Sequence, residues 1–378
     1  MKVYKKAILP KGFKASAVAC GIKRQRKLDL ALFYSELSAK TAAKFTTNKI
    51  EAAHIKIDKS YLKHSKLFQA IAVNSGNANC FTGGKGRRDA IEFSQSIAGP
   101  LHVSRDKVLV ASTGIIGKPL AIGKIKKSAA ELVAGLSKEG IEKAKKAIMT
   151  TDTFAKTVTA KFEIANKTVT ICGVAKGAGM IAPDMATMLS FIFTDANITQ
   201  GALNKTLGIC VNQSFNCITV DGCMSTNDSI FLLANGASGN ALINSGKSYG
   251  LFLKALNSVC LELAKMIVKD GEGASKFIQI KVRGAKNIRE AKKVGLNIAN
   301  SNLFKTAIFG ENKNFGRIIA AAGACGVEIK EKNIRVKLSP LEKKNINVVL
   351  DIKRGKACAM VYTSDLTPRY IKINAEYN

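Results

Sequence analysis

Short apolar segments recur between Gly- and Asn-rich turns along the whole chain, and this pattern predicts β-strands. The expected strands are Phe68–Val73, Lys107–Ala111, Lys167–Val174, Ser190–Phe193, Phe277–Val282 and Ile346–Ile352. Longer stretches rich in Ala, Lys and Leu predict helices over Asp89–Ala98, Ala121–Leu136 and Tyr249–Val268. Strands and helices are mixed without a strict βαβ order, so the pattern favours an α+β fold in layers.

Length and the N-terminal residues narrow the class of protein. The chain has 378 residues, enough for two domains or one large one. No apolar run reaches the roughly 18 residues of a membrane-spanning helix. The basic start is followed only by Ala7-Ile8-Leu9, which is too short for a secretory signal. We therefore expect a cytoplasmic protein.

Cysteine and histidine usage argues against disulfides and zinc. The nine cysteines are odd in number and contain no C-x-x-C pair, as expected for free thiols in a reducing compartment. The three histidines show no metal-ligand spacing, so we expect no metal site.

The formal net charge of +32 raises nucleic-acid binding as an alternative function. Against it, the lysines are scattered over the whole length and aromatic residues make up only 6%. Gly83-Gly84-Lys85-Gly86-Arg87-Arg88 lacks the P-loop pattern and is interpreted as a basic turn. A solvated lysine-rich surface explains the charge better.

The segment from Gly173 to Met188 carries the clearest chemical signal. Three glycines in the seven residues Gly173–Gly179 allow unusual backbone angles, and Pro183 then stiffens the chain. Thr187 follows the small Ala186 and precedes an apolar strand that we expect to begin at Met188.

A threonine at such a junction can become a nucleophile. If the Ala186–Thr187 peptide is strained, the Thr187 hydroxyl can attack the Ala186 carbonyl and form an ester that hydrolyses. Thr187 then has a free α-amine, which titrates near neutrality and can take the proton of the adjacent hydroxyl. No histidine is needed. The alternative is a threonine that only has good β-propensity.

Motifs along nearly the whole chain resemble the glutamate N-acetyltransferase/ornithine acetyltransferase family, the ArgJ-type enzymes of arginine biosynthesis. The segment Lys176–Leu189 resembles the cleavage-site signature of that family. Further collinear matches are Gly12-Phe13, Gly21–Lys23, Asp29–Ala31, Phe45–Asn48, Ala52-Ala53, Asn74–Asn79, Ser112–Gly117, Met149–Thr153, Asp270–Ala274 and Ile373–Tyr377.

The resemblance implies a self-cut between Ala186 and Thr187, which gives an α chain of residues 1–186 and a β chain of residues 187–378. The implied reaction transfers acetyl from N2-acetyl-L-ornithine to L-glutamate, with Thr187 carrying the acetyl group between two half-reactions. By the same resemblance, Thr113 and Gly114 supply the oxyanion hole, a role that suits a hydroxyl and a backbone N–H.

Five positions match the substrate-binding residues of the family: Thr150, Lys176, Thr187, Glu272 and Asn374. Lys176 could hold a substrate carboxylate or depress the pKa of the amine, and Glu272 could pair with the ornithine ammonium. On sequence alone, each of these charged residues also fits an ordinary surface position.

Three segments depart from the family pattern. Cys223 and Met224 stand in a motif that usually reads Asp-Gly-Asp-Thr-Ser-Thr-Asn-Asp, so an acid is lost. Asn312–Phe315 replaces the usual Asp-Pro-Asn-Trp. The chain ends at Asn378, one residue short of the usual Thr or Ser that helps to hold substrate.

The family resemblance also implies a layered α+β sandwich of helices and stacked sheets, and a heterotetramer of two α and two β chains. No cofactor or metal is expected, since the acetyl group is carried on Thr187. Some members also accept acetyl-coenzyme A, and the sequence leaves that open. The alternatives are a self-cleaving aminopeptidase or amidase of the same fold and a basic nucleic-acid-binding protein.

Overall fold

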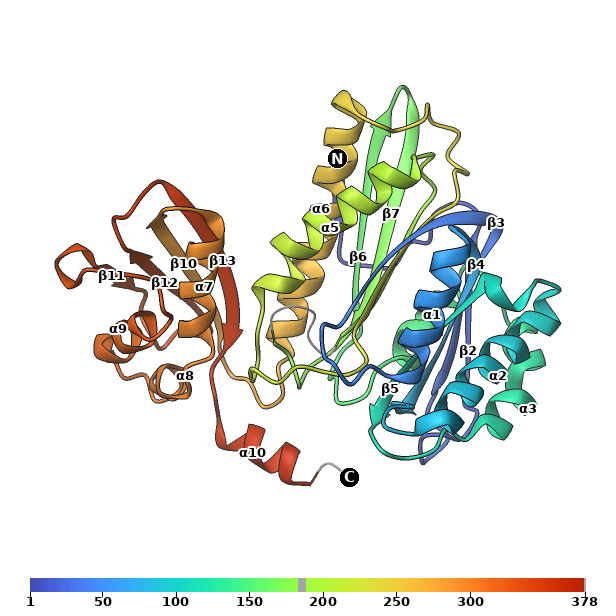
Figure 1. Ribbon diagram of the computed structural model, residues 1–378, viewed down its shortest axis with the longest axis horizontal. Helices are drawn as coiled ribbons and strands as arrows, with labels where there is room; N and C mark the ends of the chain where they lie inside the picture. The colour runs from blue at the N-terminus through green and yellow to red at the C-terminus, as the bar shows by residue number, and fades with distance from the viewer. Residues whose placement is uncertain (183–187, 377–378) are drawn as a thin grey trace. The chain divides into compact units, whose positions relative to one another are not determined.

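The computed structural model describes residues 1–182 and 188–376 (Figure 1). The chain forms two compact units that interleave along the sequence. The first comprises Met1–Gly177, the described part of Thr187–Gln213, and Ser225–Leu263. The second comprises the described part of Ala178–Ala186, Ser214–Met224, and the described part of Ala264–Asn378. The cut predicted between residues 186 and 187 lies outside the described residues.

In the part of the chain that the structure describes, the first unit is built on a nine-stranded sheet in the order β1-β6-β7-β8-β9-β3-β4-β5, with β2 paired to β3. Its strands are β1 (Lys2–Tyr4), β2 (Phe13–Val18), β3 (Leu30–Phe45), β4 (Leu67–Asn77), β5 (Val108–Ile115), β6 (Lys156–Ile164), β7 (Lys167–Lys176), β8 (Leu189–Thr194) and β9 (Ser229–Ala234). Its helices are α1 (Ala53–His64), α2 (Gly83–Leu101), α3 (Ile122–Ala134), α4 (Ile141–Ala147), α5 (Gln200–Gln213) and most of α6 (Gly246–Lys269), with a short 3-10 turn, η1, at Arg105–Lys107.

The long strand β3 joins two halves of this sheet that stack on each other. Its segment Leu30–Tyr34 pairs with β4, whereas Lys40–Phe45 pairs with β9, and the register of the β3–β4 ladder shifts between the two segments. Phe33 of β3 stacks on Phe191 of β8 with ring centroids 5.0 Å apart. Buried apolar residues from both halves form the core between them, as in packed sheets. The predicted stacking of sheets is therefore confirmed.

Helices cover the outer faces of the two halves. Phe93 of α2 and Ile125 of α3 pack in one cluster with residues of β4 and β5. On the other half, α6 lies against β6, where the ring centroids of Phe162 and Phe252 are 6.4 Å apart, and α5 lies against β3, where Gln200 donates to the Thr41 carbonyl. A Cβ on Gly173 of β7 would lie 2.7 Å from side-chain atoms of Val259 and Leu263, so only glycine lets α6 approach this closely. The first unit is thus a helix–sheet–sheet–helix sandwich, and the α+β prediction is confirmed.

The second unit has its own four-stranded sheet, in the order β11-β12-β10-β13. Its strands are β10 (Phe277–Ala285), β11 (Arg335–Leu338), β12 (Asn345–Asp351) and β13 (Ala357–Ser364). Its helices are α7 (Ile288–Ala299), α8 (Asn302–Phe309), α9 (Phe315–Gly323) and α10 (Pro368–Ala375), with 3-10 turns η2 (Phe215–Cys217) and η3 (Glu331–Asn333). Apolar residues of α7, α8 and α9 pack on β10 and β12 to form a separate core.

The predicted strands and helices are all present, with ends shifted by a few residues. The basic turn predicted at Gly83–Arg88 is wrong, because these residues form the first turns of α2. Three glycines disfavour a helix by about 1 kcal/mol each. The Asn79 amide, which donates to the Gly86 carbonyl, and the Lys85–Asp89 ion pair within the helix at 2.7 Å stabilise this helix start.

Within residues 1–182 and 188–376, no helix combines the length and apolar character needed to cross a bilayer.

Candidate active site

Strands β7 and β8 bring the two ends of the predicted cleavage segment together. They pair antiparallel, and Lys176, the last residue of β7, is opposite Leu189, the first residue of β8. Paired residues of antiparallel strands lie about 5 Å apart. Ala186 and Thr187, the predicted cleavage site and nucleophile, lie between these ends but outside the described residues.

Met188, the residue after the predicted nucleophile, is held by the start of β9. Its N–H donates to Asp228 Oδ1 at 2.8 Å, and its carbonyl accepts from the Ser229 N–H at 3.2 Å. Burial raises the pKa of Asp228 well above its usual range, although the Met188 N–H and the Lys176 charge oppose this shift. The sequence analysis did not select Asp228 as a site residue.

Two predicted site residues meet at the end of β7. Lys176 Nζ donates to Thr113 Oγ1 at 3.2 Å, and both side chains are buried although they are 63 residues apart in the chain. Because the Thr113 oxygen accepts from Lys176, its own O–H proton points elsewhere and can be donated. This is the hydrogen-bonding state that an oxyanion-hole hydroxyl needs.

Gly114 is the predicted second oxyanion donor, and its position requires glycine. Its φ is +135°, and a Cβ would lie 2.3 Å from the Gly76 carbonyl carbon and 2.5 Å from the Asn77 nitrogen. The β4 and β5 backbones therefore approach more closely here than any side chain would permit. Asn227 supports this region by donating to the carbonyl of Ser112 at 2.8 Å.

Asp152 links another predicted residue to the cleavage segment. It accepts from the Thr150 N–H at 3.0 Å, from the Gly177 N–H at 2.6 Å and from Lys156 Nζ at 2.7 Å. Burial by itself would raise its pKa, but the charges of Lys176 and Lys156 hold the pKa at about 2. Asp152 is thus ionised at neutral pH. Asp152 lies within the matched motif Met149–Thr153 and is the one acidic residue there. That property could have identified it as a site residue from the sequence.

Lys23 is a cation near the same place that was not predicted from the sequence. Its ammonium donates to the carbonyls of Leu28, Ala147 and Met149 at 3.1, 3.2 and 2.7 Å. Burial lowers its pKa to about 8, against the attraction of Asp29, and Lys176 lowers it further. The buried Lys176 and the half-buried Lys23 together favour an anionic group such as a substrate carboxylate.

Two further predicted residues meet in the second unit. Asn374 of α10 donates to Glu272 Oε2 at 2.9 Å. A Cβ on Gly179 would lie 2.2 Å from that same oxygen, so the Glu272 carboxylate rests directly against the backbone of the cleavage segment. Among the described residues, Glu272 forms no ion pair, and its charge can therefore attract a substrate ammonium.

Across the residues for which coordinates are described, no cluster of three or more His, Cys, Asp or Glu side chains could hold a metal ion.

The comparison with known families decides the identity. The model of the ArgJ family matches residues 14–378. This chain belongs to the ArgJ family.

Curated relatives match over almost their full length. The arginine biosynthesis bifunctional protein ArgJ of Caldanaerobacter subterraneus subsp. tengcongensis is 44% identical over 98% of this chain and 97% of its own. The glutamate N-acetyltransferase of Methanocaldococcus jannaschii is 43% identical over 97% of each chain. A crystal structure of an ornithine acetyltransferase complexed with ornithine, from Mycobacterium tuberculosis, is 33% identical, covering 48% of this chain and 97% of its own, with a TM-score of 0.44. The predicted family is confirmed.

The motif that begins at Asp221, in which Cys223 replaces the usual acid, holds the segment upstream of the predicted cut in place. Asp221 accepts from the N–H groups of Met180 at 2.6 Å and Ile181 at 2.9 Å, and from that of Cys223 at 3.1 Å. The Ile181 carbonyl in turn accepts from the N–H of Val220 at 2.9 Å. Cys223, which replaces the usual acid of the motif, is an exposed thiol beside this carboxylate. Asp221 therefore holds the backbone five to six residues before the cut, in a left-handed turn at Met180 (φ 58°).

Asp221→Asn should slow the self-cut about tenfold, because one carboxylate oxygen becomes an NH2 group that faces a backbone N–H. The fraction of intact chain after synthesis, followed on denaturing gels, measures the rate. Asp351→Asn is the matched control, since Asp351 lies on β12 and pairs with Arg283 at 3.0 Å. Equal cutting rates in both variants and wild type would show that Asp221 does not position the segment.

Proposed function

We propose that this ArgJ-family protein transfers acetyl from N2-acetyl-L-ornithine to L-glutamate, after cutting its own chain between Ala186 and Thr187. The observation that carries the proposal is the buried contact between Lys176 and Thr113 at the end of β7, the strand that leads into the cleavage segment. The near full-length match to a glutamate N-acetyltransferase supports the same reaction.

In the first half-reaction, Thr187 Oγ attacks the acetyl carbonyl of acetylornithine while the Thr187 α-amine takes the hydroxyl proton. The negative charge that develops on the carbonyl oxygen receives hydrogen bonds from the Thr113 hydroxyl and the Gly114 N–H. The C–N bond then breaks, the proton passes to the ornithine amine, and the acetyl ester of Thr187 remains. Glutamate's amine attacks that ester in the second half-reaction and restores the free threonine.

The charged side chains of the site are opposite in sign to the charged groups of ornithine and glutamate. Glu272, steadied by Asn374, provides a carboxylate for the side-chain ammonium of ornithine. Lys176 and Lys23 provide positive charge for a carboxylate, and Thr150 adds a polar side chain next to Asp152.

The assembly and location of the enzyme belong to the same proposal. We expect a heterotetramer of two α and two β chains that needs no cofactor or metal, since Thr187 carries the acetyl group. All nine cysteines are free thiols, which supports a reducing compartment such as the cytoplasm. Acetyl-coenzyme A is a further acetyl donor that the proposal allows.

The test is an acetyl-transfer assay with the purified protein. Incubation with acetylornithine and glutamate should produce N-acetylglutamate and ornithine in equal amounts, with ping-pong kinetics. A parallel reaction with acetyl-coenzyme A in place of acetylornithine decides whether the enzyme also makes N-acetylglutamate afresh. Release of acetate with no N-acetylglutamate would contradict transfer and indicate a hydrolase.

A further inference from the structure

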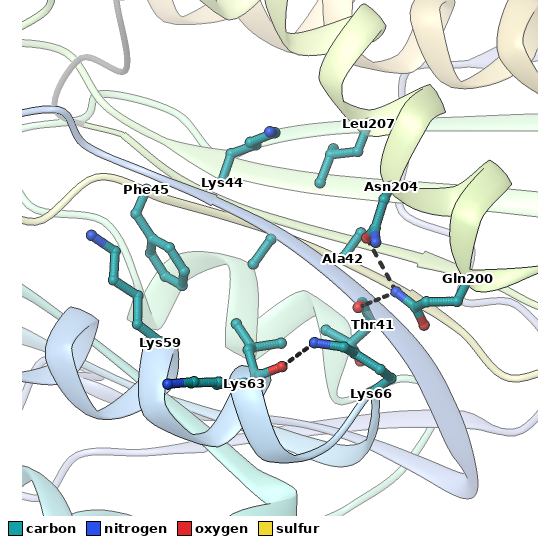
Figure 2. A pocket seen from close by; sticks show the side chains of 12 residues that line it. Thr41, Ala42, Lys44, Phe45, Lys59, Lys63, Lys66, Gln200, Asn204 and Leu207 are labelled. Carbon is teal, nitrogen blue, oxygen red and sulfur yellow. Dashed lines mark hydrogen bonds between the residues drawn. The ribbon is translucent and has the colours of Figure 1, made fainter.

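A hollow in the first unit lies between α1, β3 and α5 (Figure 2), and neither Lys176 nor Thr113 lines it. Its volume is about 420 Å³, within the range of small-molecule sites. The lining residues are Thr41, Ala42, Ala43, Lys44, Phe45, Lys59, Leu62, Lys63, Lys66, Gln200, Asn204 and Leu207.

Four lysines and no acidic residue line this hollow among the described residues: Lys44, Lys59, Lys63 and Lys66. Lys59 and Lys63 are four positions apart on α1, where like charges repel. Lys59 pairs with Glu51 and Lys66 donates to a backbone carbonyl. Lys44 and Lys63 form no hydrogen bond or ion pair with a described residue. The hollow therefore has uncompensated positive charge, and binding of an anion would relieve the repulsion.

The rest of the wall combines the Phe45 ring with polar side chains that are held in place by hydrogen bonds. The half-buried ring of Phe45 packs edge-on against Phe231, with ring centroids 5.7 Å apart. Lys59 Nζ lies 5.9 Å from the centroid of the Phe45 ring (Figure 2). Gln200 of α5 fixes the opposite wall by donating to the Thr41 carbonyl at 2.9 Å and to the Asn204 side chain at 3.1 Å. An aromatic face next to ammonium groups is the combination that binds a flat base attached to phosphates.

We propose that this hollow binds a phosphate-ester anion of nucleotide size. The phosphates contact the ammonium groups of α1 and of Lys66, and the base lies against Phe45. Lysine acts as a point charge toward phosphate, so the site selects for charge and for a flat ring rather than for one base. Its ligand differs in class from the amino-acid substrates of the acetyl transfer.

Calorimetric titration of the whole wild-type protein with ADP tests the proposal. Lys59→Gln/Lys63→Gln should weaken ADP binding at least tenfold. Lys143→Gln/Lys146→Gln on α4 is the matched control, because it removes the same charge from two exposed lysines and should bind ADP like wild type. This control separates a local site from the general attraction of a chain with a net charge of +32.

Inorganic pyrophosphate, which lacks the base, identifies which part of the ligand is recognised. Tighter binding of ADP than of pyrophosphate, together with a loss of that difference in Phe45→Leu, supports a nucleotide as the source of the phosphates. Equal binding of ADP and pyrophosphate that still needs Lys59 and Lys63 would overturn the contact between the base and Phe45 and leave a site for phosphate anions alone. No binding of either anion, or equal weakening in the α4 control, would overturn the proposal.

Discussion

Thr187→Ala should leave one intact chain of 40.4 kDa, whereas the wild-type protein should appear as two fragments, residues 1–186 and 187–378. The variant lacks the hydroxyl that attacks the Ala186 carbonyl, and without the cut no free α-amine forms at position 187. Acetyl transfer should therefore fall by at least about a thousandfold. Denaturing mass analysis measures the cut, and the acetylornithine-to-glutamate assay measures the transfer.

Thr187→Ser is the control for this variant, since it keeps a hydroxyl at the same position and should still be cut. A wild-type chain that stays intact would mean that Thr187 never gains its amine. Transfer by an uncut Thr187→Ala chain would place the nucleophile elsewhere. Either result would overturn the mechanism while leaving the family assignment unchanged.

Asp152→Asn should lower the free energy of unfolding by about 3–5 kcal/mol at pH 7, the usual loss when one partner of a buried ion pair is removed. The Lys156 ammonium lies 2.7 Å from Asp152 and is fully buried, and Lys176 faces the same carboxylate electrostatically. An amide cannot neutralise either charge. Denaturant unfolding measures the loss, and Glu142→Gln, at an exposed ion pair with Lys145, should change stability by under about 1 kcal/mol.

The effect of Asp152→Asn also depends on pH in a defined direction. The folded-state pKa of Asp152 is about 2, below the ordinary value of 3.8, so its ionised form stabilises the fold. That contribution is complete above pH 4 and is lost as the pH falls toward 2. The difference between wild type and variant should therefore be constant from pH 7 to about 4 and shrink below it. A difference that grows on acidification would contradict the proposed charge on Asp152.

Local sequence patterns predicted the strands well because apolar runs reflect burial on both faces of a sheet. The predicted strand Ser190–Phe193 is the interior of β8, and every residue of β8 is buried. The same reasoning failed at Gly83–Arg88. Glycine propensity argued for a turn there, but contacts with Asn79 stabilised a helix.

Motif matching selected Thr113, Lys176, Glu272 and Asn374, and the structure brings these together in pairs: Lys176 with Thr113 and Glu272 with Asn374. It did not select Asp152, Asp228 or Lys23. Their roles depend on burial and on the charges that face them, and neither property can be inferred from spacing along the chain.

The sequence by itself therefore determined six of the strands and three of the helices, the family and the position of the candidate nucleophile. These depend on neighbouring residues: hydrophobic periodicity, and a threonine after a glycine-rich loop and before an apolar strand. Only the tertiary structure decided which side chains share the site and how they are charged. Lys176 meets Thr113 across 63 residues because β3 carries the sheet through both stacked halves. Burial raises the pKa of Asp228, whereas the charges of Lys176 and Lys156 lower the pKa of Asp152 against the effect of its burial.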